Sequence, residues 1–145
     1  MINAEVTTLL APDGTPVANV AFDVSNDQLR AAEHALGEIK LERHRGRDLD
    51  IDDVLALREL TGVRDELDHL AAAGGHAHVL LPLARFIVLH DALHEWVAGR
   101  QERGWVRPES EKALAIAAAM LGPMDTLRAD ALAAVLGTQS ETETL

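Results

Sequence analysis

The sequence contains no cysteine and no tyrosine. Without cysteine, the chain forms no disulfide bond, no thiolate metal site and no cysteine nucleophile. Only four of the 145 residues are aromatic, two Phe and two Trp, so the core must consist of aliphatic side chains and alanine, which suits closely packed helices. Lysine is also scarce, with two residues, and the list of possible catalytic groups is therefore short.

Positive charge is outnumbered, because 13 Lys and Arg residues face 24 Asp and Glu residues and the net charge is −11. Such a chain repels phosphate backbones and anionic lipids, so we expect neither nucleic acid nor a membrane surface as partner. The excess of arginine over lysine is typical of GC-rich bacterial genomes. The N-terminus has no basic signal region and no apolar run reaches about 18 residues, which predicts a cytoplasmic protein.

The length fits a single domain over residues 1–137, followed by an acidic tail over 138–145 that we expect to be disordered. Two β-prone runs within residues 5–24 flank a Pro-Asp-Gly-Thr turn and predict a β-hairpin. Two strands alone are marginal in water, so helices or a further strand must cover them. The sequence thus predicts a mainly helical α+β fold, in which this hairpin precedes about five helices around a long central helix at about 79–103.

Local signals predict where these helices begin and end. Pro82 suits a first turn, so the long helix is expected to start near Val79 or Leu80. The apolar phase changes near Thr61-Gly62, which predicts two shorter helices joined by a bend. Gly122-Pro123 is expected to stop the helix that opens at Pro108, and Asp125 or Thr126 to start a last one.

Histidines four residues apart on the long helix form the first candidate site. His90 and His94 could both reach one metal ion, and Glu59 is the best-placed acid for a third ligand. In the alternative interpretation, His90 is a buried core histidine with a pKa below 6.5 and His94 lies at the rim. We expect no cofactor, with a divalent transition metal as the alternative.

Three further residue patterns resemble functional sites, but each has a simpler interpretation. Three histidines, His69, His76 and His78, flank an Ala-Gly turn and could converge on a zinc or nickel ion. Exposed histidines, however, bind such ions weakly even where the protein has no metal-dependent function. The pairs Glu66/His69 and Asp91/His94 imitate di-iron ligands, yet some 25 Å of helix separates them. Residues 55–70 faintly resemble a helix-turn-helix, but the second helix is too acidic to approach DNA.

A second apolar line on the long helix, at Leu81, Val88 and Ala92, predicts an interface with a second copy of the chain. No nucleophile motif, phosphate loop or dinucleotide fingerprint is present, so we do not expect an enzyme. The leading expectation is a non-enzymatic helical regulatory or protein-interaction module that forms a homodimer and binds another protein. The alternatives are a histidine-based metal-binding protein or small metalloenzyme, and a degenerate helix-turn-helix regulator.

Overall fold

The computed structural model describes residues 2–44, 49–74 and 77–143. The elements follow in the order β1 (Ile2–Leu10), β2 (Pro16–Val24), α1 (Asn26–His44), α2 (Ile51–Ala72), β3 (Ala77–Pro82), α3 (Leu83–Arg103) and α4 (Pro108–Glu143). The mainly helical α+β fold is confirmed. The described residues form four helices rather than about five, and a sheet of three strands.

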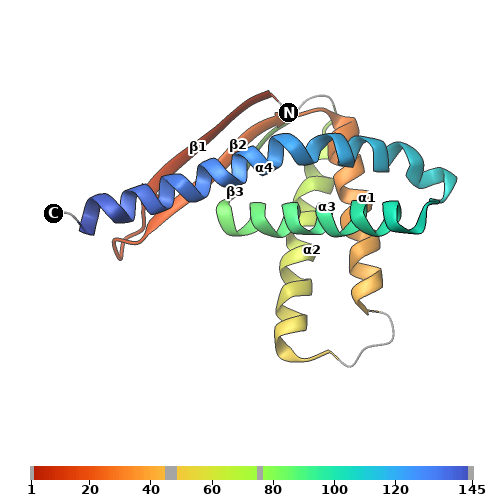
Figure 1. Cartoon of the computed structure of the whole chain (residues 1–145), viewed down its shortest axis with the longest axis horizontal. Helices are drawn as coiled ribbons and strands as arrows, with labels where there is room; N and C mark the ends of the chain where they lie inside the picture. The colour runs from red at the N-terminus through yellow and green to blue at the C-terminus, as the bar shows by residue number, and fades with distance from the viewer. Residues whose placement is uncertain (1, 45–48, 75–76, 144–145) are drawn as a thin grey trace.

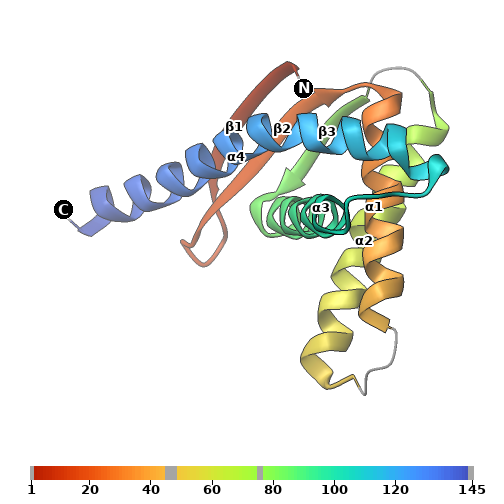
Figure 2. The ribbon, with the colours of Figure 1, turned by 45° about the vertical axis from the view of Figure 1, so that its right-hand side comes forward.

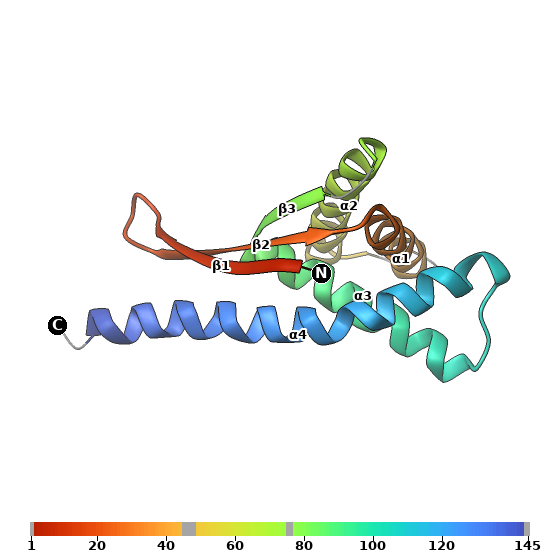
Figure 3. The same ribbon diagram turned by 90° about the horizontal axis from the view of Figure 1, so that it is seen from above.

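The other three helices, α2, α3 and α4, pack around α1. In Figure 1, α1 and α2 lie side by side, and α3 and α4 run across them. Figure 2 shows α3 almost end-on, close to α1 and α2 and next to α4. Seen from above, α4 follows the β1–β2 hairpin away from the other helices (Figure 3). We call the β1–β2 turn and the part of α4 after Met124 the arm.

The predicted hairpin forms, and its turn has the expected chemistry. Gly14 has a φ of 85°, and the Asp13 side chain accepts a hydrogen bond from the Thr15 amide at 2.9 Å. Along β2, Val20 and Phe22 are 0% and 2% exposed, so one face is covered as the alternating pattern requires. The third strand, β3, pairs antiparallel with β2 and gives the hairpin the additional partner that it needs.

The long central helix begins at Leu83, so its predicted start at Val79 or Leu80 is wrong. Residues 77–82 form β3 instead, with Val79 and Leu81 buried and Leu80 56% exposed. Apolar residues in this run satisfy both helical spacing and strand alternation, and pairing with β2 decides between them. Pro82 ends the strand where α3 begins.

The predicted bend at Thr61-Gly62 is also wrong, because α2 runs through both residues without interruption. The apolar phase changes for another reason: Ile51 is 76% and Leu55 50% exposed, so the first turns of α2 are uncovered. A regular buried stripe follows, formed by Leu57, Leu60, Val63, Leu67 and Ala71. With no turn inside residues 55–70, the resemblance to a helix-turn-helix is lost.

Helix α4 continues through Gly122-Pro123, where the sequence predicts a stop and a new helix. Met120, Met124 and Leu127 lie 4%, 0% and 6% exposed at helical spacing, so the same buried face continues across the proline. This packing outweighs the hydrogen bond that Pro123 cannot donate. The backbone of α4 is helical through Glu143, and Thr144 and Leu145 lie outside the described residues, so the disorder of the tail stays a prediction.

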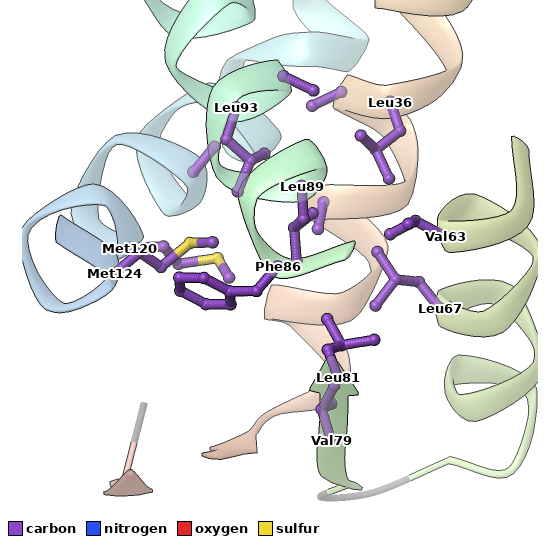
Figure 4. Packing of buried hydrophobic residues seen from close by; sticks show 14 of the residues in the cluster. Leu36, Val63, Leu67, Val79, Leu81, Phe86, Leu89, Leu93, Met120 and Met124 are labelled. Atoms are coloured by element: carbon purple, nitrogen blue, oxygen red, sulfur yellow. The ribbon is translucent and has the colours of Figure 1, made fainter. Parts of the chain in front are cut away.

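The core is aliphatic with few aromatic residues, as the composition predicts. Figure 4 shows Met120 and Met124 of α4 beside the ring of Phe86 of α3. Two residues of the predicted interface, Leu81 and Ala92, are 0% exposed, so they belong to the core of the single chain. The third, Val88, is half-buried. No helix among the described residues is long and apolar enough to cross a membrane.

Gly62→Ala is expected to stabilise the protein by up to ~1 kcal/mol, because glycine inside a helix costs about that much relative to alanine. The added Cβ would meet only Arg85 Nη2, at 3.8 Å, which is an ordinary van der Waals contact. Chemical denaturation followed by circular dichroism measures the change in the free energy of unfolding.

Gly37→Ala on α1 is the matched control. There the added Cβ would lie 3.0 Å from Arg64 Nη2 and 3.1 Å from Arg64 Cζ, so the guanidinium group would have to shift. We expect a smaller gain than at Gly62, or a loss. A loss of stability in Gly62→Ala would instead contradict an uninterrupted α2.

Candidate metal centre

Two histidines of α3 and one aspartate of α4 meet at the contact between these helices. Asp125 Oδ1 lies 2.5 Å from His90 Nε2 and 2.8 Å from His94 Nε2. One potential ligand atom from each residue lies within 4.8 Å of the other two. Histidine nitrogens and a carboxylate oxygen are ligands that zinc and iron(II) accept, so these three side chains form a candidate metal centre.

Packing of α3 against α4 positions the three side chains. His90 is 4% exposed, and its ring stacks against Phe86 with a centroid distance of 6.0 Å. His94 follows one helical turn later, with its ring centroid 4.6 Å from that of His90. On α4, buried Met124 precedes Asp125, whose carboxylate therefore projects from the edge of the helix contact.

Burial and hydrogen bonding set the charges in the cluster. Burial lowers the pKa of His90 below its usual 6.5, although the hydrogen bond with Asp125 acts in the opposite direction. Hydrogen bonds from His94 and His90 lower the pKa of Asp125. At neutral pH the cluster therefore combines a neutral His90 with an ionised carboxylate, the charge states that a metal ligand needs. The predicted burial of His90 is confirmed, and burial lowers its pKa even though an acid, Asp125, is adjacent.

Arg128 selects the tautomer of His90 in this arrangement. Its Nη1 lies 3.3 Å from His90 Nδ1 and 2.5 Å from Asp91 Oδ1. A guanidinium group only donates, so His90 Nδ1 accepts and Nε2 carries the proton that it donates to Asp125. A metal ion on Nε2 would require this proton on Nδ1, where it would face Arg128. Arg128 thus stabilises the metal-free form.

The third ligand predicted from the sequence, Glu59, is not part of the cluster. Its carboxylate instead lies 4.0 Å from Arg85 Nε. The prediction assumes that residues 63–73 and 79–103 form an antiparallel hairpin, which would leave the histidines near a separate helix that carries Glu59. Instead α2 is one helix, α3 begins at Leu83, and α4 supplies Asp125 to the histidines. A sequence signal was available in part: residues 90–94 read His-Asp-Ala-Leu-His, which is one methylene short of the zinc-binding H-E-x-x-H pattern.

The other histidine patterns do not converge in the described part of the chain. His78 Nδ1 pairs with Asp23 Oδ1 at 2.7 Å across β2 and β3, and His69 is exposed near the end of α2. His76 lies outside the described residues. Glu66 pairs with Arg85 at 3.3 Å, so it is engaged away from His94, as the distance argument against a di-iron site requires.

A second polar cluster, which the sequence analysis missed, joins three helices at Glu38 of α1. Glu38 Oε2 accepts hydrogen bonds from Trp96 Nε1 at 2.7 Å and from Arg100 Nη2 at 2.5 Å. Its other oxygen, Oε1, lies 3.1 Å from His34 Nε2 and accepts a hydrogen bond from Ser110 Oγ at 3.2 Å. We call these five residues the Glu38 junction. The spacing of His34/Glu38 and Trp96/Arg100 by four residues was the available signal.

Ser110, His34 and Glu38 do not form a catalytic triad. In a triad, one ring nitrogen faces the serine and the other faces the acid. Here the same nitrogen, His34 Nε2, lies 2.9 Å from Ser110 Oγ and 3.1 Å from Glu38 Oε1. The histidine therefore cannot transfer a proton between them in the manner of a triad, and the Glu38 junction is structural.

The stability that the Glu38 junction contributes depends on pH. Burial alone would raise the pKa of Glu38, but the hydrogen bonds from Trp96 and Arg100 outweigh it and the pKa is lowered. A carboxylate with a lowered folded-state pKa adds stability above its unfolded-state pKa, and this stability is lost as the pH falls through the folded-state value. The junction should therefore weaken in acid.

Glu38→Gln is expected to destabilise the protein at pH 7 by about 1–3 kcal/mol, because buried Arg100 loses a charged partner. The difference from the unmodified protein should shrink as the pH falls below about 4, where Glu38 itself becomes protonated. Urea denaturation at pH 7, 5, 4 and 3 measures this. Glu59→Gln, at a side chain that is 58% exposed, is the control and should have little effect. A difference that is constant with pH would contradict the assignment.

The chain matches no protein-family model, and no curated protein or solved structure matches it. The chemistry of the two clusters therefore rests on their own geometry.

Proposed function

We propose that the protein binds one divalent transition-metal ion through His90, His94 and Asp125. The observation that carries this proposal is the convergence of three ligand atoms from α3 and α4 within 4.8 Å. Two histidines and a carboxylate match the three protein ligands of open zinc sites, where water takes the fourth position, and of iron(II) sites. Zinc is the first metal to test.

The Asp125 carboxylate would need only a small movement away from each histidine to admit an ion between them. Zinc bonds of about 2.0–2.1 Å with tetrahedral geometry separate ligand atoms by about 3.3 Å. The present separations from Asp125 Oδ1 are 2.5 Å and 2.8 Å, so the atoms must part by somewhat less than about 1 Å. The side chains of Asp125 and His94 are 54% and 47% exposed, which leaves them room to move.

Charge also supports metal binding over catalysis. The net charge of −11 attracts cations to the surface. Asp91 occupies the position of the general base in the H-E-x-x-H pattern, but it is paired with Arg128 at 2.5 Å. Because this carboxylate is engaged, we assign the site a binding role and no reaction.

Chelator-treated protein titrated with zinc in a calorimeter is expected to take up one ion, and zinc should raise the melting temperature. His94→Gln and Asp125→Asn each remove one ligand and should weaken binding at least about tenfold, which is 1.4 kcal/mol. His69→Gln, at an exposed histidine of α2, is the matched control and should bind as the unmodified protein does. Equal affinity in all four proteins would overturn the proposal.

The Arg128→Gln variant, titrated with zinc in the same way, tests the role of Arg128. If Arg128 stabilises the tautomer that metal must displace, its removal should tighten zinc binding several-fold. Arg43→Gln is the control, because Arg43 also pairs with α3, through Glu95 at 2.8 Å, but away from the cluster. Unchanged or weaker binding in Arg128→Gln would contradict the role given to Arg128.

A second candidate function is the self-associating interaction module that the sequence predicts. The observation that favours it is an apolar surface on the arm, where Leu132 and Leu136 are 40% and 63% exposed one turn apart on α4. Strand β1 pairs only with β2 among the described residues, so its outer edge is open. Two such edges could pair antiparallel about a two-fold axis, which makes a second copy the proposed partner.

Sedimentation equilibrium at micromolar concentration tests this second function. We expect a species of twice 15.6 kDa, and Leu136→Glu should return it to 15.6 kDa because a charge opposes burial in the interface. Leu55→Glu, at a 50% exposed leucine of α2, is the matched control and should leave the dimer intact. A single species at 15.6 kDa in the unmodified protein would exclude self-association.

A further inference from the structure

A cavity of about 210 Å³ lies where α1, the end of α3 and the segment 104–107 meet. Its floor includes Glu38, Arg100 and Ser110, the buried part of the Glu38 junction. Ten residues of α3 separate Arg100 from His90, a distance of about 15 Å along the helix. The cavity is therefore distinct from the proposed metal centre.

The apolar wall of the cavity is unusually exposed. Trp105 is 66% and Leu41 60% exposed, and both line the cavity together with Val106. Gly104, with a φ of 76°, ends α3 in the left-handed conformation and directs the chain into the segment that carries Trp105. The structure thus places a large, mostly exposed aromatic side chain at the rim of the cavity, where a flat apolar group could cover it.

Positive charge is in excess at the same rim. Glu42 Oε1 is held by Arg100 Nη2 at 2.6 Å, and Arg103 lies only within 3.9 Å of the same oxygen. Arg107 also lines the cavity and has no acidic partner among the residues that the structure describes. Three arginines thus face two glutamates, a local charge of +1 in a chain whose net charge is −11.

The volume of the cavity limits the size of the ligand that it could bind. At roughly 30 Å³ for each water molecule, the cavity would hold about seven waters, and it is smaller than the roughly 300–1,000 Å³ of pockets for drug-sized ligands. A single ring with a short side chain fits that scale. Guanidinium groups bind carboxylates through paired hydrogen bonds, and an indole face stacks on a flat ring.

We propose that this cavity binds a small aromatic carboxylate, with its carboxylate at Arg103 and Arg107 and its ring against Trp105. The three features that carry the proposal are the cavity volume, the arginine excess and the exposed indole. All three lie together at this end of α3, and none of them involves a metal.

Phenylacetate titrated into the full-length protein tests the proposal, with the indole N–H signals in ¹H–¹⁵N NMR spectra as the readout. We expect a saturable shift of the Trp105 indole signal with a dissociation constant of about 1 mM or below, and a much smaller shift for Trp96, which is 0% exposed. Phenylacetamide, the neutral match, should bind at least about fivefold more weakly, because it lacks the charge that strengthens hydrogen bonds from arginine.

Variants at the rim locate the binding. Arg107→Gln should weaken phenylacetate binding at least about fivefold, and so should Trp105→Leu, followed by the backbone amide of residue 106. Both positions are exposed, so the fold should be retained. Arg58→Gln, at an exposed arginine of α2, is the matched control and should bind as before. No saturable shift up to about 10 mM, equal binding of the amide, or unchanged affinity in Arg107→Gln would each overturn the proposal.

Discussion

The arrangement of the helices depends on the Glu38 junction, in which one carboxylate of α1 holds Trp96 and Arg100 of α3 and reaches Ser110 of α4. Arg100 is 8% exposed and pairs with both Glu38 and Glu42, so losing Glu38 would leave a charge with little water to solvate it and one acidic partner fewer. The junction therefore helps to set the rotation of α3 about its axis. That rotation turns the histidines toward α4 and closes the floor of the cavity at the other end.

Local chemistry made part of the fold predictable. The hairpin follows from its turn residues, and the start of α4 follows from Pro108, because both depend only on neighbours in sequence. Strand β3 was missed since its partner, β2, lies far back along the chain and supplies the hydrogen bonds that decide the conformation. At Pro123 the local rule predicts a stop, but a buried stripe that contains Met120 and Met124 prevails.

The residues of the candidate site likewise differ in whether the sequence alone could reveal them. The spacing of His90 and His94 on one helix could be found from the sequence, and so could the burial of His90. Asp125 could not, since it reaches the histidines only if α4 remains one helix beyond Pro123. The Glu38 junction likewise needs the pairing of α1 with α3: the four-residue spacings place side chains on one face of each helix but do not show which helices meet.

Pro123 lies two residues before Asp125 and donates no backbone hydrogen bond to the preceding turn of α4. One backbone hydrogen bond of the helix is therefore missing beside the histidines. Eighteen residues separate Asp125 from the end of α4 at Glu143, roughly 27 Å of helix. A change of about 3° in the direction of α4 at Asp125 would displace the far end by more than about 1 Å. The position of the far end of α4 along the hairpin is therefore sensitive to the geometry at the histidines.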